Sequence, residues 1–206
     1  MNPRVSLALV LVAALTAGAM LLVASGEGDE TATAPTGPFE GALMPPGVRA
    51  PDFELENQDG ETVRMRDFRG TPVIVTFLYT NCDDTCPPQA QQIKGALNEL
   101  GHDLPALAIA VDPENDTPAS ARRFLAEYRL TGRIDFVLGT REQLAPLWKA
   151  FAIRPQSVRE DHTARTVLID ARGYQRVGFP LEQTTPERLA HDLRLLEAEA
   201  GAQASG

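Results

Sequence analysis

The sequence is poor in the residues that carry metal and redox chemistry. Among its 206 residues there are only two cysteines, Cys82 and Cys86, and three histidines. Neither cysteine lies near the end of the N-terminal apolar run, which excludes a lipid-modified thiol there. The Thr-x-x-Cys pattern of a peroxidatic cysteine is absent as well. Any sulfur chemistry must therefore come from one closely spaced pair.

Positive charge is also in deficit. The chain has 19 Lys and Arg against 28 Asp and Glu, for a net charge of −9. This balance argues against a nucleic-acid surface and fits an acidic domain, or one that meets a basic partner. No internal repeat is visible, and a hydrophobic content of 43% supports one ordinary core with appendages.

Long apolar runs are missing except at residues 5–24, which carry no charge. Twenty such residues in a helix span the roughly 30 Å of a bilayer core. Arg4 precedes the run and the acidic Glu27 and Asp29 follow it, so the rest of the chain is predicted outside the cytoplasm. Residues 1–24 are either a transmembrane anchor, which the length favours, or a signal peptide whose cleavage leaves a secreted periplasmic protein. Both alternatives place the cysteines in an oxidising compartment.

The remainder divides into three parts. Residues 25–47 are rich in Gly, Ala, Thr and Pro without periodicity, and predict a flexible linker. Residues 48–200 predict the folded domain, and residues 201–206 a disordered polar tail.

Within residues 48–200, strand patterns alternate with helix patterns and end in a hairpin and a helix, which predicts an α/β sheet of mixed direction. The predicted strands are 50–55, 62–65, 73–79, 107–111, 134–138, 166–169 and 175–179. The predicted helices begin at Cys86, Thr117, Thr140 and Thr185.

The cysteines stand where a buried strand runs into a helix that opens with Pro87. The unpaired N–H groups and the dipole of a helix N-terminus stabilise thiolate. The Cys-x-x-x-Cys spacing puts both thiols on one face, about 6 Å apart at Cα. That separation suits a disulfide and equally suits two sulfurs that bind one ion, while a structural disulfide or two unrelated core residues are the alternatives.

Three blocks carry a family resemblance. Residues 77–87 resemble the Cys-x-x-x-Cys-Pro signature of the Sco/SenC family of copper proteins, residues 111–118 its second block, and residues 161–170 its histidine block. The resemblance covers about residues 48–200. It implies a thioredoxin-like fold, with a mixed central sheet flanked by helices, on a membrane anchor. It also implies a metallochaperone rather than an enzyme. Such a protein delivers copper to, or prepares the thiols of, the subunit II copper centre of cytochrome c oxidase or another copper-accepting protein.

The resemblance implies a copper site formed by Cys82, Cys86 and His162. Two thiolates suit Cu(I), and an added imidazole suits the site to Cu(II) as well. Asp161 either orients the imidazole or is a solvated loop charge. His102 and His191 are predicted to be exposed and outside the site.

One departure from the family pattern and one alternative function matter here. Asp83 stands where the family usually has Pro, and Asp83 with Asp84 is predicted to raise the pKa of the thiols. The alternative function is an extracytoplasmic thiol–disulfide oxidoreductase that uses Cys82 and Cys86 without copper transfer. His162 discriminates between the two, because a pure reductase has no need of it.

Overall fold

The computed structural model describes residues 37–156 and 163–204. In this part of the chain a six-stranded sheet has the order β1-β8-β7-β4-β5-β6, and a separate hairpin joins β2 to β3. The β4–β5 and β5–β6 pairs are parallel, and the other pairs are antiparallel. The strands are β1 (Ala42–Leu43), β2 (Glu54–Glu56), β3 (Thr62–Arg64), β4 (Val73–Leu78), β5 (Ala106–Ala110), β6 (Asp135–Val137), β7 (Arg165–Ile169) and β8 (Gln175–Pro180).

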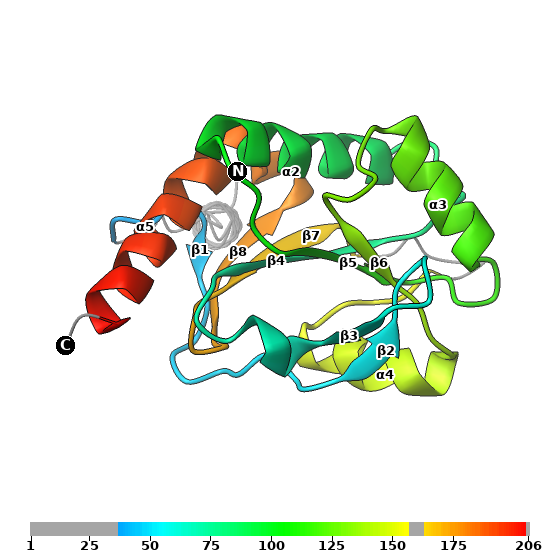
Figure 1. Ribbon diagram of the computed structural model, residues 1–206, viewed down its shortest axis with the longest axis horizontal. Helices are drawn as coiled ribbons and strands as arrows, with labels where there is room; N and C mark the ends of the chain where they lie inside the picture. Colours follow the sequence, from blue (N-terminus) through cyan, green and yellow to red (C-terminus); the bar gives the residue numbers. More distant parts are fainter. Residues whose placement is uncertain (1–36, 157–162, 205–206) are drawn as a thin grey trace, which may run out of the picture. The chain divides into compact units, whose positions relative to one another are not determined.

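Helices cover both faces of the sheet (Figure 1). On one side lie α2 (Cys86–Leu100), α3 (Pro118–Glu127) and α5 (Pro186–Ala204), the last reached through the 3-10 helix η2 (Leu181–Gln183). On the other lie α4 (Arg141–Ala150), the 3-10 helix η1 (Met65–Phe68) and the β2–β3 hairpin. The predicted α/β architecture, a mixed sheet flanked by helices, is therefore confirmed.

The central strand β4 is held between these layers, and all six of its residues are buried. Above it α2 and α5 approach each other closely at Gly95, where a Cβ would lie 2.6 Å from Pro186 Cγ. On the opposite face, the Trp148 indole N–H on α4 donates to the carbonyl of Ala110 on the adjacent strand β5 over 2.9 Å. Close packing on both faces of the sheet restricts the movement of the end of β4, from which the cysteine loop starts.

Several predicted boundaries need correction. The strand predicted over 50–55 is confined to β2, because Pro51 has no N–H for a ladder and the N–H of Ala50 donates to Gly173 instead. At the other end, α5 continues through Ala204, so four residues of the predicted disordered tail are helical.

The predicted membrane span at residues 5–24 lies outside the described residues. Within the described part of the chain, no helix is both long and apolar enough to cross a bilayer.

The predicted linker also ends earlier than residue 47. Residues 39–43 form an N-terminal strap in which Phe39 is buried and β1 pairs with β8. The backbone N–H groups of Glu40 and Gly41 donate to the two carboxylate oxygens of Asp192 on α5, over 2.8 and 3.0 Å. A side chain at Gly41 would collide with Phe179. These contacts are tertiary, so the Gly- and Pro-rich composition of the segment does not show them.

The strap yields a stability prediction. Asp192 is fully buried, and Asp192→Ala leaves two backbone N–H groups without their charged acceptor. We expect the free energy of unfolding to fall by about 3 kcal/mol, measured by chemical denaturation. Asp52→Ala removes the same group at an exposed position and should change stability by less than about 0.5 kcal/mol. Equal effects of the two substitutions would show that the strap contributes nothing.

Candidate metal and redox site

Both cysteines lie at the junction of β4 and α2, as the sequence predicts. β4 ends at Leu78, Cys82 lies in the connecting loop, and Cys86 is the first residue of α2. Both are free thiols, with exposed fractions of only 4% for Cys82 and 0% for Cys86. Of the two cysteines, only Cys82 has any exposed surface.

The first turn of α2 has few backbone N–H groups to offer, because Pro87 and Pro88 have none. Thr85 is the N-cap residue, yet its side chain accepts no capping hydrogen bond. The N–H of Cys86 donates instead to Cys82 Sγ over 3.1 Å. A sulfur thus takes the place of the usual capping oxygen.

These contacts lower the pKa of the Cys82 thiol to about 5. The largest cause is a hydrogen bond from the Cys86 thiol. The Thr85 hydroxyl, 3.3 Å from the sulfur, the Cys86 backbone N–H and the Tyr79 hydroxyl add to it, and burial opposes them. Each of these groups donates a hydrogen bond that the thiolate accepts, which stabilises the ionised form. At neutral pH Cys82 is therefore ionised.

The pKa of Cys86 shifts the other way. Burial is the largest cause of the raised pKa of Cys86, and the hydrogen bond that its thiol donates to Cys82 raises it further. The pair thus holds one proton at neutral pH, on Cys86. The spacing of the cysteines alone does not reveal that the two thiols have opposite pKa shifts.

The sequence predicts a raised thiol pKa beside the acidic pair, but the net pKa of Cys82 is lowered. Asp84 Oδ1 lies 3.6 Å from Cys82 Sγ, but it also accepts the N–H of Thr85 over 2.6 Å. That backbone hydrogen bond is the largest cause of a lowered pKa at Asp84. The donors around the sulfur outweigh the carboxylate of Asp84, because an exposed charge interacts weakly in the high dielectric of water.

A buried carboxylate, Asp116, holds the loop that carries Cys82. It accepts the N–H of Thr80 over 2.7 Å and that of Asp112 over 3.1 Å. Burial raises its pKa to about 6, against these hydrogen bonds. The Thr80 hydroxyl also bonds Ser120 on α3. Sequence reasoning placed Asp116 in a family block but gave it no role, because the partner that ties it to the cysteine loop, Thr80, lies 36 residues away.

Gln89, one turn after Cys86, ties α2 to the start of β7. Its side-chain amide donates to the carbonyl of Arg165 over 2.8 Å and lies 2.5 Å from the Thr76 hydroxyl. The side chain is fully buried. The sequence gives little signal for it, because Gln91 and Gln92 follow and only burial distinguishes Gln89 from them.

His162 and Asp161 lie outside the described residues. The described residues on either side of this segment are held by backbone contacts. The N–H of Thr163 donates to the Arg154 carbonyl over 3.1 Å, and that of Gln156 to the Val111 carbonyl over 3.0 Å. Val111 in turn donates to Leu78 over 3.0 Å. Gln156 is thereby linked to the end of the strand that leads to Cys82.

The other histidines lie elsewhere, as predicted. The His102 side chain is 51% exposed and pairs with Glu197, and the His191 side chain is 45% exposed and contacts Asp192. Within residues 37–156 and 163–204, no three His, Cys, Asp or Glu side chains are grouped so that they could hold a metal ion.

Together, the sheet order, the helices on both faces and a dithiol at the strand-to-helix junction define a thioredoxin-like α/β domain with a cysteine pair at the start of a helix. The family model described as SCO1/SenC matches residues 45–197. The chain belongs to the SCO1/SenC family.

Individual relatives agree with this assignment. Protein SenC of Rhodobacter capsulatus is 32% identical over 151 residues, which cover 67% of this chain and 66% of the relative. The SCO1 protein homolog of Bacillus subtilis is 33% identical over 91 residues, 42% of this chain and 47% of that protein.

Solved structures give the same result. Bradyrhizobium japonicum ScoI, a structure with copper bound, superposes with a TM-score of 0.62 at 30% identity, over 72% of this chain and 99% of that one. BsSco, described as a member of the Sco family of cytochrome c oxidase assembly proteins with a disulfide switch, gives 0.66 at 26% identity, over 74% of this chain and 95% of that one.

The thiol pair yields a pH prediction. Cys86→Ala removes the largest hydrogen bond to the Cys82 sulfur, so we expect the pKa of Cys82 to rise from about 5 toward the ordinary thiol value. The rate of alkylation by iodoacetamide against pH measures it, since only thiolate reacts. Cys86→Ser keeps a donor and should give a smaller rise. A midpoint near 5 in the alanine variant would contradict the role of Cys86.

Proposed function

We propose that this protein is a copper metallochaperone. In this proposal Cys82, Cys86 and His162 bind copper and deliver it to the subunit II copper centre of cytochrome c oxidase or to another copper-accepting protein. The observation that carries the proposal is the dithiol at the start of α2, with one sulfur already ionised, in a chain of the SCO1/SenC family. Copper is the cargo of the protein, not a resident cofactor.

The described residues suit Cu(I). Thiolates are soft ligands, and Cys82 provides one at neutral pH without losing a proton. Cys86 must give up its proton when the metal binds, because only the thiolate coordinates. Two sulfurs, one from the loop before α2 and one from its first residue, leave coordination positions on the metal open to a partner's ligands. Copper can therefore be transferred to a partner whose ligands take up these open positions.

His162 is proposed as the third ligand. Its neighbour Thr163 is hydrogen-bonded to Arg154, and Gln156 is connected through Val111 to the end of β4. The described residues on either side of His162 thus lie at the cysteine end of the sheet, which supports the proposal. An imidazole there would matter more for Cu(II), which prefers nitrogen to thiolate more than Cu(I) does.

The same pair supports a second function, the reduction of a partner's disulfide. The Cys82 thiolate attacks one sulfur of the disulfide and displaces the other as a thiolate, which forms a mixed disulfide. Cys86, after losing its proton, then attacks Cys82 Sγ and releases the second partner thiol. The partner gains two electrons, and the protein is left with a Cys82–Cys86 disulfide. The low pKa of Cys82 beside a protonated Cys86 favours this division of roles.

Both functions are proposed to operate outside the cytoplasm. The support is the uncharged run at residues 5–24 with Arg4 before it and acidic residues after it. Whether that run is an anchor or a cleaved signal decides between a membrane-held and a secreted periplasmic protein.

Variants of the three ligands test the copper proposal. Cys82→Ser or Cys86→Ser should abolish tight binding of Cu(I) and Cu(II). The loss should exceed the roughly 10–100-fold that an outer partner costs. His162→Ala should weaken Cu(II) binding far more than Cu(I) binding, measured by competition with a chelator, and His102→Ala is the matched control. Unchanged Cu(II) affinity and spectrum in His162→Ala would exclude the histidine and favour the reductase function.

The protonation of the pair gives a separate prediction. Because one thiol is ionised and the other is not, Cu(I) binding near pH 7 should release about one proton per site. Near pH 4, below the pKa of Cys82 at about 5, it should release about two. Proton release can be measured with a pH indicator in weak buffer, and His162→Ala removes any contribution of the imidazole. Release of two protons at pH 7 would show that both cysteines are protonated thiols.

A further inference from the structure

A second charged site lies at the end of the sheet opposite the cysteines. β4 runs toward the cysteine loop, and β7 is antiparallel to it, so the β7–β8 turn after Ile169 lies at the far end. Three exposed arginines, Arg49, Arg69 and Arg172, converge on this turn. We call them the arginine cluster. They gather in a chain whose net charge is −9.

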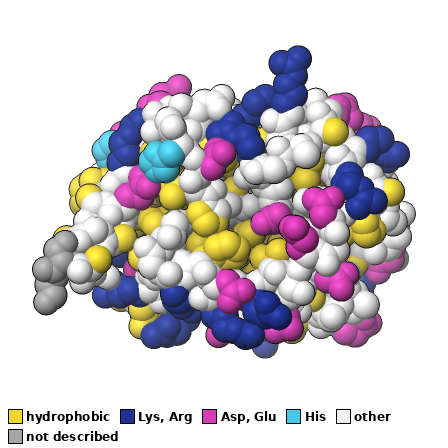
Figure 2. Space-filling model, viewed as in Figure 1, with side chains coloured by type: hydrophobic (Ala, Val, Ile, Leu, Met, Phe, Trp, Pro, Cys, Tyr) yellow, Lys and Arg dark blue, Asp and Glu magenta, His cyan; other side chains and the backbone are white. Residues whose placement is uncertain are grey.

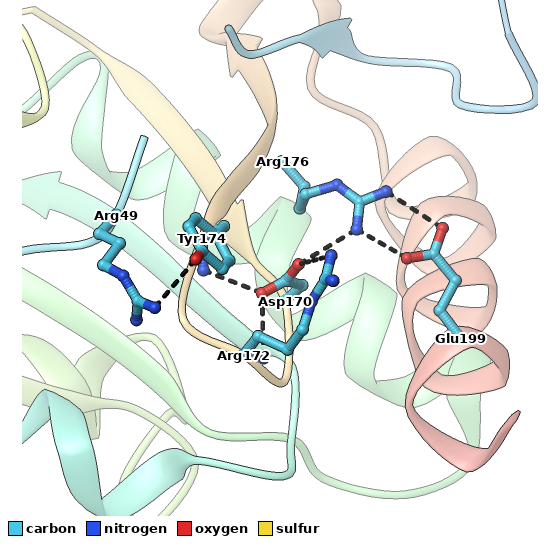
Figure 3. A network of polar contacts seen from close by, with 6 residues as sticks. All are labelled: Arg49, Asp170, Arg172, Tyr174, Arg176 and Glu199. Carbon is cyan, nitrogen blue, oxygen red and sulfur yellow. Dashed lines mark hydrogen bonds and ion pairs between the residues drawn. The ribbon is translucent and has the colours of Figure 1, made fainter. Parts of the chain in front are cut away.

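Each guanidinium is positioned by the turn. Arg49 lies over the Tyr174 ring, 4.5 Å from its centre, and donates to the Tyr174 hydroxyl over 2.9 Å. Arg172 lies 5.5 Å from the centre of the same ring. Figure 3 shows Arg49 and Arg172 close to the tyrosine. The Arg69 guanidinium occupies the space where a Cβ at Gly173 would be.

Backbone contacts hold the three segments together. The N–H of Ala50 donates to the Gly173 carbonyl, and that of Gly70 to the Ala171 carbonyl, each over 2.9 Å. The residues beside Arg49 and Arg69 are thereby fixed to the turn. Stacking on Tyr174 and the backbone contacts beside Arg49 and Arg69 already restrict these side chains. A ligand therefore loses less binding free energy to side-chain ordering.

The carboxylates nearby are already neutralised. Asp170, buried beneath the turn, accepts from Arg176 over 3.1 Å and from Arg172 over 3.4 Å. Arg176 also pairs with Glu199 over 2.6 Å, and Figure 3 shows this chain of contacts. Two carboxylates thus balance Arg172 and Arg176. Arg49 and Arg69 form no ion pair within the described residues, so two positive charges remain.

We propose that the arginine cluster binds a phosphate oxyanion. Guanidinium groups recognise phosphate through paired N–H donors and keep their charge at every physiological pH. Arg172 is 57% exposed despite its contact with Asp170, so its donors remain open to a ligand. In the view of Figure 2, Lys and Arg side chains gather along the lower edge of the molecule, near the β7–β8 turn of Figure 1.

The phosphate could belong to a lipid headgroup or to a free phosphate compound, and the chemistry of recognition is the same. Because the cluster and the cysteines lie at opposite ends of the sheet, an anion held at one end leaves the thiols free for a partner. The proposal does not depend on copper binding, and its test leaves the cysteines unchanged.

Arginine modification by phenylglyoxal, located by mass spectrometry, tests the proposal on the full chain in nanodiscs of zwitterionic lipid. Addition of pyrophosphate should slow modification of Arg49 and Arg172 about fivefold or more. Arg123, exposed on α3, reports any general effect and should not change. Nanodiscs that contain phosphatidylglycerol, without pyrophosphate, test the lipid source. Protection should disappear in 1 M salt.

Protection by pyrophosphate alone would identify a free phosphate as the ligand, and protection by phosphatidylglycerol alone a headgroup. In either case Arg69→Gln should abolish protection of Arg49 and Arg172, whereas Arg123→Gln should leave it intact. Unchanged rates with both probes, or equal slowing at Arg123, would overturn the proposal.

Discussion

The hydrogen bond from the Cys86 N–H to Cys82 Sγ is the contact on which the site depends. Two prolines remove the neighbouring N–H groups, so one donor remains at the start of α2, and a sulfur receives it. The same contact begins the helix, fixes the loop and stabilises the thiolate. The Cys86 thiol adds a second donor to the same atom. The same hydrogen bonds therefore determine both the start of α2 and the low pKa of Cys82.

Polar contacts at the edges of an apolar core hold this end of the sheet in place. Asp116 fixes the loop before Cys82, and Gln89 fixes the turn after Cys86 to β7. Both side chains are buried, where an unmade hydrogen bond is costly. The far end of the sheet has its own polar hub at Asp170. Hydrogen bonds from the Tyr174 N–H and Arg176, with the charge of Arg172, lower the pKa of Asp170 against the effect of burial. The two ends of the sheet are thus held by separate sets of polar contacts.

Predictions from the sequence succeeded where local patterns decide the structure. The helix starts predicted at Thr117 and Thr140 are confirmed, and each of these residues caps its helix, α3 or α4, through its side chain. Errors came where distant partners decide. The N-terminal strap has no periodicity, yet Asp192 and β8 hold it. The net pKa of Cys82 is lowered rather than raised, because it depends on donors whose positions residue order does not show.

The sequence by itself determined the cysteine pair, its place between strand and helix, and the family. Residue type, spacing and proline restrictions act within a few residues and need no tertiary contact. The tertiary structure alone decided which thiol is ionised, because that depends on burial and on the direction of individual donors. It also decided that three arginines from separate segments meet at one turn, because the Arg49–Tyr174 bridge and the hydrogen bond from Gly70 to Ala171 bring these segments to the β7–β8 turn.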